Sequence, residues 1–537
     1  MRESQGKSVA ETFAEAMSAY QDGKTAEARR LTRKLVERHP DFGGAHYLLG
    51  LLALDHGQGK AAAGHLARAI TITPGQAVLH LTMGRALDLS GNHAEACLHY
   101  RTALSLTPDH AEAHARLGQG LRRLGKPGEA VSHCRRAVAL DPAHAEAWNS
   151  LGGLLQETGQ PAEAADCLRR ALALRPDWPA ALNNYGVALK DLGRLDEAAT
   201  ILEGAVGLRP AHGGSRANLA AVYRALGRLD DARAQAEAGT RAEPRNPDAW
   251  LELGLARQAE GYPDGAAAAF ERAVAIAPKN VRAWFCLGEI RRSRGLADQA
   301  RKAYDRCLTL DPADRFGAAL GLALAVGTAA PDRAPAAYVR QLFDDYADRF
   351  DEALIGGLDY RAPALLAQAL AAALGPVGGL TVLDAGCGTG LAAGMLRPLA
   401  ARLDGIDLSP AMIAKAGERG LYDHLQTGDI VAALAAGGIR YDLIVAADVL
   451  VYLGDLAPLL TAAHAVLAPR GAFAFTVEKT DARAWILGPK QRYAHSAAYL
   501  GQAAAAAGFD VALMEDAVTR HDAGLPVPGL VVVLRKA

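Results

Sequence analysis

Alternating glycines follow a short apolar run at residues 381–391, where the sequence is TVLDAGCGTGL. Glycine has no side chain, so a loop built from it lets the backbone come within contact distance of a ligand. A dinucleotide-binding loop has the pattern G-x-G-x-x-G, but Leu391 stands where the third glycine belongs. An acid, Asp384, precedes the first glycine by two residues. The loop is therefore a poor match to a dinucleotide site.

With its acid included, the loop has the pattern D-x-G-x-G-x-G, and DAGCGTG matches that pattern at every fixed position. It resembles motif I of the class I S-adenosylmethionine-dependent methyltransferases. The resemblance implies S-adenosylmethionine as cofactor. Its sulfonium cation would be attracted by a nearby carboxylate, whereas the phosphates of a dinucleotide would be repelled by it. It also implies that Gly386, Cys387 and Gly388 line the methionyl part, with Asp384 held nearby directly or through water.

Two further acids occur where this resemblance requires them. Asp407 ends the second expected strand, in LDGIDLS, and matches the family acid that accepts hydrogen bonds from both ribose hydroxyls. Asp429, in QTGDI, matches the residue that accepts a hydrogen bond from the adenine amino group. Leu408 and Ile430 would be the apolar flanks of the ring. Three features in one order make the cofactor prediction much more specific than a glycine loop alone.

The resemblance extends to the neighbouring stretches AADVLVYLGDL and LFDDYADRFDEAL. In the first, Ala447 and Asp448 are expected to border the cofactor, and Tyr452 to face the pocket. The second resembles the lid helix of the small-molecule branch, which makes Tyr346 the candidate to close over the methionyl end. Arg361 has two interpretations, pairing with the cofactor carboxylate or with a neighbouring acid.

Methyl transfer is an in-line displacement at an activated carbon, so positioning supplies most of the catalysis. Oxygen nucleophiles and protonated nitrogen nucleophiles also need a base. Glu478, Tyr493 and His495 follow the fifth expected strand on the side where ligands bind in open α/β sheets, so they are the catalytic candidates. For His495 the alternative is a capping or packing role at the start of the next helix.

The elements around these residues alternate between apolar strands and helices from residue 337 to 537. Helices are expected at 337–355 and 361–374, ahead of the first strand. This alternation predicts parallel strands with right-handed crossovers, and the resemblance implies a Rossmann-like α/β domain with a mostly parallel seven-stranded sheet. The preceding stretch, 329–336, has the proline and alanine composition of a linker.

A repeat of constant period occupies the chain before that linker. Three series of residues recur every 34 positions: prolines from Pro40 to Pro312, glycines from Gly23 to Gly295 and alanines from Ala28 to Ala300. Proline ends a helix, glycine allows the tight turn, and alanine permits two helices to approach closely. The sequence therefore predicts nine helical pairs.

These units resemble the tetratricopeptide repeat (TPR), whose pattern is matched by Trp148, Leu151, Gly152, Ala164 and Pro176. The resemblance predicts an α-solenoid over residues 7–328, a TPR superhelix of about nine repeats with a capping helix near 313–327. It implies a concave groove that holds a peptide or protein partner.

Asn184 and Asn218 hold equivalent places on two first helices. They resemble a two-rung version of the asparagine ladder with which the O-linked N-acetylglucosamine transferase repeats grip peptide backbone. Ordinary groove polarity is the alternative.

The composition excludes several other classes. With 58 basic and 59 acidic residues, the chain has no overall field to attract a phosphate backbone, which disfavours nucleic acid. Its six cysteines are scattered without metal-ligand spacing, so we expect reduced thiols and no metal site. No apolar run reaches the length of a membrane span, and we expect a cytoplasmic protein without membrane contact.

Three hypotheses follow for the whole chain. The first is a methyltransferase acting on a small-molecule or carrier-bound acceptor, with the repeats binding a partner or substrate protein. The second is a protein methyltransferase whose groove holds the polypeptide substrate. The third is a scaffold whose methyltransferase domain binds cofactor without turnover.

Overall fold

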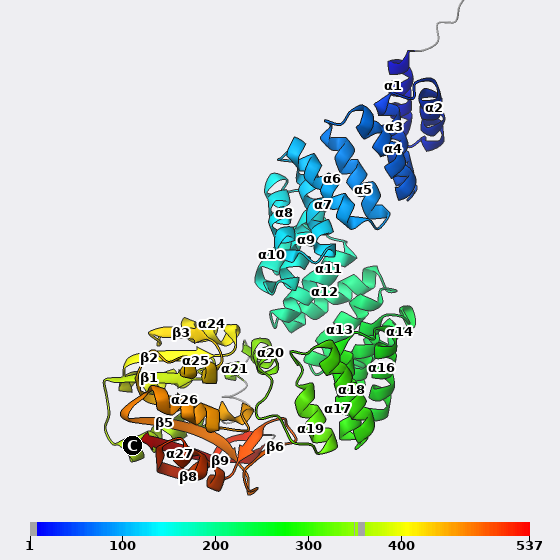
Figure 1. Cartoon of the computed structure of the whole chain (residues 1–537). Helices are drawn as coiled ribbons and strands as arrows, with labels where there is room; N and C mark the ends of the chain where they lie inside the picture. The colour runs from blue at the N-terminus through cyan, green and yellow to red at the C-terminus, as the bar shows by residue number, and fades with distance from the viewer. Residues whose placement is uncertain (1–7, 348–349, 353–359, 523) are drawn as a thin grey trace, which may run out of the picture. The chain divides into compact units, whose positions relative to one another are not determined.

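The computed structural model describes residues 8–347, 350–352, 360–522 and 524–537. The chain divides into two units, Met1–Pro244 and Arg245–Ala537, and the division falls inside the helical array. The first unit contains α1 to α14, and the second contains α15 to α19 followed by an α/β domain (Figure 1).

Each repeat consists of two helices that pack against each other, and within each unit the second of them also packs against the first helix of the next repeat. This arrangement confirms the predicted repeat fold. The first unit comprises α1 (Val9–Gln21), α2 (Thr25–Arg38), α3 (Gly43–Asp55), α4 (Gly59–Ile72), α5 (Ala77–Leu89), α6 (His93–Leu106), α7 (Ala111–Arg123), α8 (Pro127–Leu140), α9 (Ala145–Glu157), α10 (Pro161–Leu174), α11 (Pro179–Asp191), α12 (Leu195–Leu208), α13 (Gly213–Ala225) and α14 (Leu229–Ala242). The repeats of the second unit are α15 (Pro247–Ala259), α16 (Pro263–Ile276), α17 (Val281–Ser293) and α18 (Ala297–Leu310).

The recurring residues have the roles that their chemistry predicts. The nine turn glycines, Gly23 to Gly295, have φ between +70° and +81°, and a Cβ would have open space at each of them. Backbone conformation alone therefore requires glycine at these turns. The nine recurring alanines, Ala28 to Ala300, are completely buried, as expected where two helices approach most closely.

The second unit continues from its two repeats into α19 (Ala318–Val326), which packs on α17 and α18 in the place predicted for a capping helix. The nine-stranded sheet that follows has the order β3-β2-β1-β4-β5-β7-β6, with β9 paired to β5 and β8. The pairs β1/β2, β1/β4, β2/β3, β4/β5 and β5/β7 are parallel. The pairs β5/β9, β6/β7 and β8/β9 are antiparallel. The short strands β6 and β7 extend the predicted seven-stranded, mostly parallel sheet.

The strands are β1 (Leu380–Ala385), β2 (Ala400–Asp407), β3 (His424–Thr427), β4 (Tyr441–Ala446), β5 (Leu467–Lys479), β6 (Trp485–Leu487), β7 (Tyr493–His495), β8 (Phe509–Asp522) and β9 (Leu525–Lys536). The helices of this domain are α20 (Ala336–Tyr346), α21 (Phe350–Glu352), α22 (Ala362–Leu374), α23 (Ala393–Leu396), α24 (Pro410–Glu418), α25 (Ile430–Ala436), α26 (Ala457–Val466) and α27 (Ala497–Ala506), with 3-10 turns at Arg397–Leu399 and Leu450–Tyr452. Part of the helix predicted at 337–355 lies outside the described residues.

Both faces of the sheet are apolar, as buried parallel strands require. Alternate residues of one strand belong to different cores because side chains point to opposite faces in turn. Val382 of β1 packs in a cluster with Leu366 of α22, whereas its neighbour Leu383 packs in another with Leu459 of α26. Two helical layers thus cover the sheet and leave the carboxyl ends of its parallel strands to form a site.

The stretch 329–336, predicted as a linker, pairs with the segment after β4. The N–H of Ala334 donates to the carbonyl of Tyr452 at 2.8 Å, and the N–H of Gly454 donates to the carbonyl of Asp332 at 2.7 Å. Arg333 and Leu453 form an antiparallel bridge between these two contacts. This stretch is therefore an ordered part of the α/β domain's framework.

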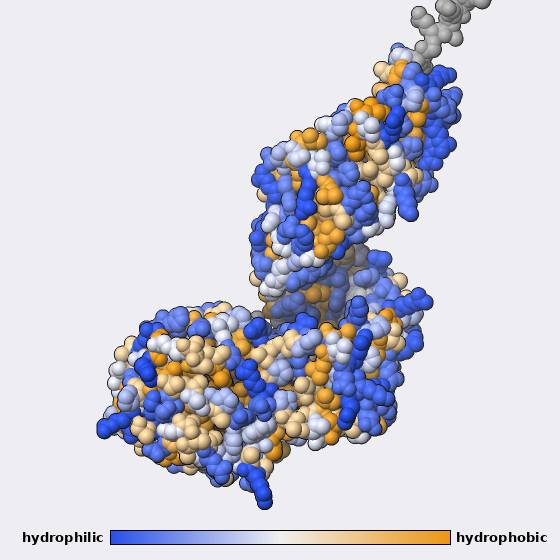
Figure 2. Space-filling view, viewed as in Figure 1, coloured by the Kyte–Doolittle hydropathy of each residue, from blue (hydrophilic) through white to orange (hydrophobic). Residues whose placement is uncertain are grey.

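Hydrophilic residues cover much of the visible surface of the helical repeats, interrupted by small hydrophobic patches (Figure 2). Among the residues that the structure describes, no helix combines the length and apolar character needed to cross a membrane.

Candidate active site

A cavity of about 300 Å³ lies at the carboxyl ends of the parallel strands. Its lining combines glycines, acids and aromatic residues from the predicted cofactor site with residues of α20 and of the segments near β7 and β8. The described residues that line it are Arg333, Ala334, Ala336, Val339, Leu342, Phe343, Tyr346, Phe350, Tyr360, Gly386, Gly388, Asp407, Leu408, Gly428, Asp429, Ile430, Ala447, Asp448, Val449, Tyr452, Leu453, Arg492 and Arg520.

The glycine loop forms one wall of this cavity through Gly386 and Gly388. Gly386 has a φ of +80°, and a Cβ there would lie 2.4 Å from Cγ2 of Val449. Side-chain size and backbone conformation therefore both require glycine at this position. Cys387 is buried behind the wall, and its N–H donates to the carbonyl of Ile406 at 2.9 Å.

Asp407 lies at the end of β2 and is joined to the glycine loop. Its Oδ2 accepts a hydrogen bond from the N–H of Gly388 at 2.9 Å, and its Oδ1 accepts one from the N–H of Ser409 at the same distance. Burial raises the pKa of Asp407, and these two N–H groups oppose that effect. The carboxylate is thus held in one orientation at the cavity wall, with lone pairs left for a ligand.

Asp384 is almost fully buried and is absent from the described lining. Its Oδ2 accepts a hydrogen bond from the hydroxyl of Tyr422 at 2.7 Å. Burial raises the pKa of Asp384 to about 7. Asp384 therefore lies beneath the glycine loop, and of the direct and water-mediated contacts predicted for it, the direct contact has no support.

The predicted adenine-side residues Leu408, Asp429 and Ile430 all line the cavity. Asp429 caps α25, because its Oδ1 accepts a hydrogen bond from the N–H of Ala432 at 2.9 Å. Its Oδ2 accepts one from Nη1 of Arg333 at 3.1 Å. The segment before α20 therefore fixes this acid as well.

Helix α20 supplies an aromatic wall that includes the predicted lid residue Tyr346. Phe343 packs edge-to-face on Phe350 and on Tyr452, with ring centroids 5.9 and 5.5 Å apart, and Tyr346 packs on Phe350 at 6.1 Å. Asp344 anchors the helix by accepting a hydrogen bond from the hydroxyl of Ser409. Ser409 lies two residues after Asp407, so this hydrogen bond fixes α20 relative to that acid.

Ala447 and Asp448, which were predicted to border the cofactor, line the cavity. The hydroxyl of Tyr360 donates to the carbonyl of Ala447 at 3.3 Å, and burial raises the pKa of Tyr360 well above its ordinary value. Arg361, by contrast, is exposed and is not among the described residues that line the cavity. It stands at the start of α22, where its backbone N–H donates to the carbonyl of Thr519. Of its two interpretations, pairing with a bound cofactor has no support.

The three predicted catalytic residues are not brought together in the cavity. Tyr493 and His495 are completely buried. The Tyr493 hydroxyl donates to the carbonyl of Pro331 at 2.6 Å, and Nε2 of His495 lies 3.0 Å from the carbonyl of Gly454. Burial lowers the pKa of His495 to about 4. Both side chains have packing roles, which corrects the prediction of direct catalytic contact.

Glu478 lies behind the cavity wall and is ion-paired. Its Oε1 accepts a hydrogen bond from Nε of Arg492 at 2.7 Å and another from Arg520. A carboxylate held by two guanidinium groups is poorly suited to accept a proton, so Glu478 is better described as a partner of the arginines.

The lining residues that had not been predicted include Arg333, Phe343, Tyr360, Arg492 and Arg520. For Arg492 a signal was present, because strand side chains alternate in direction. Tyr493 and His495 share one face, which places Arg492 and Ala494 on the opposite face. No comparable local signal marks Arg520 on β8.

The lining fits S-adenosylmethionine in its chemistry. The wall at Gly386 and Gly388 carries no side chain, so a cofactor can approach the backbone. Carboxylates at the ends of β2 and β3, Asp407 and Asp429, are hydrogen-bond acceptors suited to hydroxyl and amino groups.

Comparison with known families identifies both parts of the chain. Residues 383–473 match the methyltransferase domain family. Tetratricopeptide repeat models match residues 13–77, 81–145, 121–183, 189–254, 247–290 and 281–314. These matches confirm the predicted repeats, the class I methyltransferase domain and its methyl donor, S-adenosylmethionine.

The chain is 37% identical over 110 residues to the ubiquinone biosynthesis O-methyltransferase of Methylobacterium sp. (strain 4-46), covering 20% of this chain and 44% of that protein. It is 36% identical over 110 residues to the malonyl-[acyl-carrier protein] O-methyltransferase of Pseudescherichia vulneris, covering 20% and 43%. The chain thus spans less than half the length of these curated relatives. A solved structure, the APC/C hetero-tetramer Cut9-Hcn1, is similar over 52% of this chain and 55% of its own, with 19% identity and a TM-score of 0.41.

Proposed function

We propose that this chain, which joins tetratricopeptide repeats to a class I methyltransferase domain, transfers a methyl group from S-adenosylmethionine to a small-molecule or carrier-bound acceptor. We also propose that the repeats bind a partner protein. The observation that carries the first part is a shared cavity, because the glycine wall, Asp407 and Asp429 line it together with the aromatic wall of α20. A donor and a small acceptor can therefore meet in one cavity.

The residues of the chain have distinct roles in this proposal. Asp407 binds the ribose hydroxyls, and Asp429 with Ile430 binds the adenine. Gly386 and Gly388 admit the methionyl part to the backbone, while Tyr346 and Phe343 exclude water from above. When bound, the cofactor supplies a methyl carbon already activated by a sulfonium. Positioning by these residues then accounts for most of the rate enhancement.

An oxygen acceptor is supported by the names of the relatives, which are O-methyltransferases. We also place the protein in the cytoplasm, which the six free and buried cysteines support.

Calorimetric titration with S-adenosylmethionine tests the cofactor site. Asp407→Ala removes the carboxylate, and losing two charge-assisted hydrogen bonds of about 1.5 kcal/mol each corresponds to roughly a hundredfold weaker binding. Asp510→Ala, an exposed acid on β8, is the matched control and should leave the dissociation constant unchanged. Equal affinities for the two variants would contradict the proposed site.

The acceptor class is tested by incubating the protein and methyl-labelled cofactor with cell extract. Label in small molecules supports the proposal, and label in polypeptide favours a protein methyltransferase. Absence of label beyond that of a Gly386→Arg control would favour a scaffold without turnover.

For the repeats, the proposal rests on a polar hollow of about 560 Å³ lined by Gln119, Arg122, Arg123, Ser150, Leu154 and Glu157, on the first helices α7 and α9. The two predicted asparagine rungs are already engaged. Asn184 donates to Asn149 at 3.1 Å, and Asn218 donates to Asn183 at 2.9 Å. A ligand there would compete with these pairs.

A photo-crosslinking residue at Gln119 should capture a polypeptide partner. The same residue at Arg169, exposed on the second helix α10, is the control. Equal capture from both positions would argue against a partner in the hollow.

A further inference from the structure

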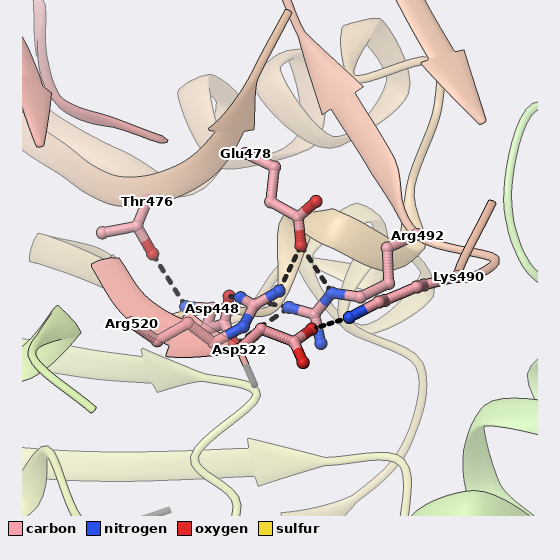
Figure 3. A network of polar contacts seen from close by, with 7 residues as sticks. All are labelled: Asp448, Thr476, Glu478, Lys490, Arg492, Arg520 and Asp522. Atoms are coloured by element: carbon pink, nitrogen blue, oxygen red, sulfur yellow. Dashed lines mark hydrogen bonds and ion pairs between the residues drawn. The ribbon is translucent and has the colours of Figure 1, made fainter. Parts of the chain in front are cut away.

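A cluster of two arginines and two carboxylates lies at the end of the cavity near β4, β5 and β8 (Figure 3). Nη2 of Arg492 donates to both oxygens of Asp448, at 2.9 and 3.0 Å, and Nη1 of Arg520 donates to Oδ1 of the same residue at 2.9 Å. Both arginines also donate to Oε1 of Glu478. The N–H of Asp448 donates to the hydroxyl of Thr476 at 2.9 Å, which holds Asp448 at a left-handed φ of +59°.

The two positive and two negative charges of this cluster balance, but one hydrogen-bond donor is left without an acceptor in the cluster. The four side chains are only 5 to 20% exposed, a degree of burial that charged groups tolerate when paired. Both oxygens of Asp448 are occupied, and Glu478 is absent from the described lining. Arg492 lines the cavity, and no described residue accepts a hydrogen bond from its Nη1. Nη1 of Arg492 is therefore available to donate a hydrogen bond from a cationic group to a ligand in the cavity.

The cluster belongs to the acceptor end of the cavity. Asp407 and Asp429, assigned to the cofactor's nucleoside, follow β2 and β3 on one side of β1. Asp448 follows β4, Arg492 precedes β7, and Arg520 belongs to β8, so these three come from the opposite half of the sheet. A group bound by Arg492 would lie on the far side of the donor's nucleoside.

Beside Arg492, the cavity wall is largely apolar or aromatic. The guanidinium carbon of Arg492 lies 5.5 Å from the centroid of the Tyr452 ring, and Tyr452 packs on Phe343 of α20. Val339 and Leu342 extend this wall. An acceptor that fits here has an apolar body and an anionic end.

Each carboxylate that lines the described part of the cavity is already engaged. Asp407 accepts from two backbone N–H groups, Asp429 accepts from Arg333 and from the start of α25, and Asp448 accepts from two arginines. His495 is buried outside the lining. Among the described lining residues, a hydroxyl or protonated amine acceptor would find only these engaged carboxylates as a base, whereas a carboxylate acceptor has no proton to lose.

We propose that the acceptor is a small, mostly apolar carboxylic acid whose carboxylate is bound by Arg492 beside Tyr452. This inference rests on the proposed methyl transfer and specifies its substrate. One carboxylate oxygen forms a bond to the methyl carbon while the carbon–sulfur bond breaks and its electron pair remains on sulfur. The products are a methyl ester and S-adenosylhomocysteine, whose sulfur is now an uncharged thioether, and no proton is released. Arg492 binds the carboxylate and thereby determines specificity.

The test uses the full chain, methyl-labelled S-adenosylmethionine and the protein-free fraction of a cell extract as the source of acids. Methyl esters are hydrolysed by alkali and release volatile labelled methanol, whereas methyl ethers and methylamines are stable. We expect most of the transferred label to become volatile after alkali. Alkali-stable label would overturn the carboxylate acceptor while leaving methyl transfer intact, and label only in the protein fraction of whole extract would overturn the small acid. Absence of label from every fraction would contradict methyl transfer itself.

A second measurement concerns Arg492, using the labelled acid isolated from the extract. Arg492→Gln should raise KM for the acid at least tenfold and leave the dissociation constant of S-adenosylmethionine within threefold, because Arg492 faces the acceptor end. If that variant fails to bind cofactor, Arg492→Lys decides, since it keeps the charge that balances Asp448 and Glu478. Arg535→Gln, an exposed arginine on β9, is the control. An unchanged KM in both Arg492 variants would overturn the assignment.

Discussion

The glycine loop offers a quantitative prediction through Gly386→Ala. The added Cβ would lie 2.4 Å from Cγ2 and 2.7 Å from Cγ1 of Val449, so about 1 Å of displacement is needed to restore an ordinary contact near 3.4 Å. The overlap costs about 1–3 kcal/mol. The φ of +80° adds about 1–2 kcal/mol for a residue with a Cβ. The combined strain of roughly 2–5 kcal/mol should appear as lost stability or, where the loop shifts to relieve it, as lost affinity.

The assay is calorimetric titration with S-adenosylmethionine, accompanied by thermal melting. We expect Gly386→Ala to bind at least about 30-fold more weakly, since roughly 2 kcal/mol corresponds to that factor. A double-mutant cycle with Val449→Ala separates the two causes, because removing both Cγ atoms relieves the overlap and leaves the backbone strain. The double variant should therefore recover part of the loss.

Gly375→Ala is the matched control for this prediction. Gly375 ends α22 with a φ of +69°, and a Cβ there meets nothing within 4 Å. It should lose about 1–3 kcal/mol of stability without a change in cofactor affinity. Cofactor binding by Gly386→Ala within threefold of the natural protein, or an absence of rescue by Val449→Ala, would refute this account of the loop.

Three further predictions concern protonation and the repeats. Because burial raises the pKa of Asp384 to about 7, the stability that its protonated form contributes is full below pH 4 and is lost as pH rises through 7. A cationic cofactor should favour the ionised form, so cofactor binding near pH 7 should release a proton. The binding enthalpy should then vary with the buffer in the natural protein and not in Asp384→Asn. His495 has its pKa lowered to about 4, so the unfolded chain binds more protons between pH 4 and 6.5; stability should rise across this window by up to about 3 kcal/mol, and melting of His495→Gln should show a smaller slope. In the repeats, Gly84→Ala should lower the melting temperature more than Gly159→Ala, because a Cβ at Gly84 would lie 2.3 Å from the Tyr100 ring while one at Gly159 meets only backbone strain; equal shifts would contradict this.

The repeats were predictable because each requirement is local and recurs at every unit. A positive φ at the turn between two helices demands glycine whatever the neighbours are, so Gly23 and Gly295 carry the same signal. The cofactor acids were predictable for a related reason. Asp407 and Asp429 stand directly after strands, and parallel strands bring their carboxyl ends to one edge of the sheet.

The acceptor end was not predictable in the same way. Arg520 reaches Asp448 because β8 pairs with β9 and β9 pairs with β5, a register that no local pattern specifies. Tyr493 and His495 have suitable chemistry and lie in the right stretch, but their strand directs them into the packed interior. Strand alternation indicates Arg492 only after the strand and its buried face are known.

The ordered stretch before α20 has a practical and evolutionary consequence. Asp332 and Ala334 pair with the segment after β4, and Arg333 holds Asp429, so a stretch with the composition of a linker contributes to the wall of the cavity. A fragment cut at residue 337 to isolate the α/β domain would open that wall and release a cofactor acid. A fusion or domain exchange should therefore keep residues 331–336 with the α/β domain, and an insertion placed in this stretch should impair cofactor binding.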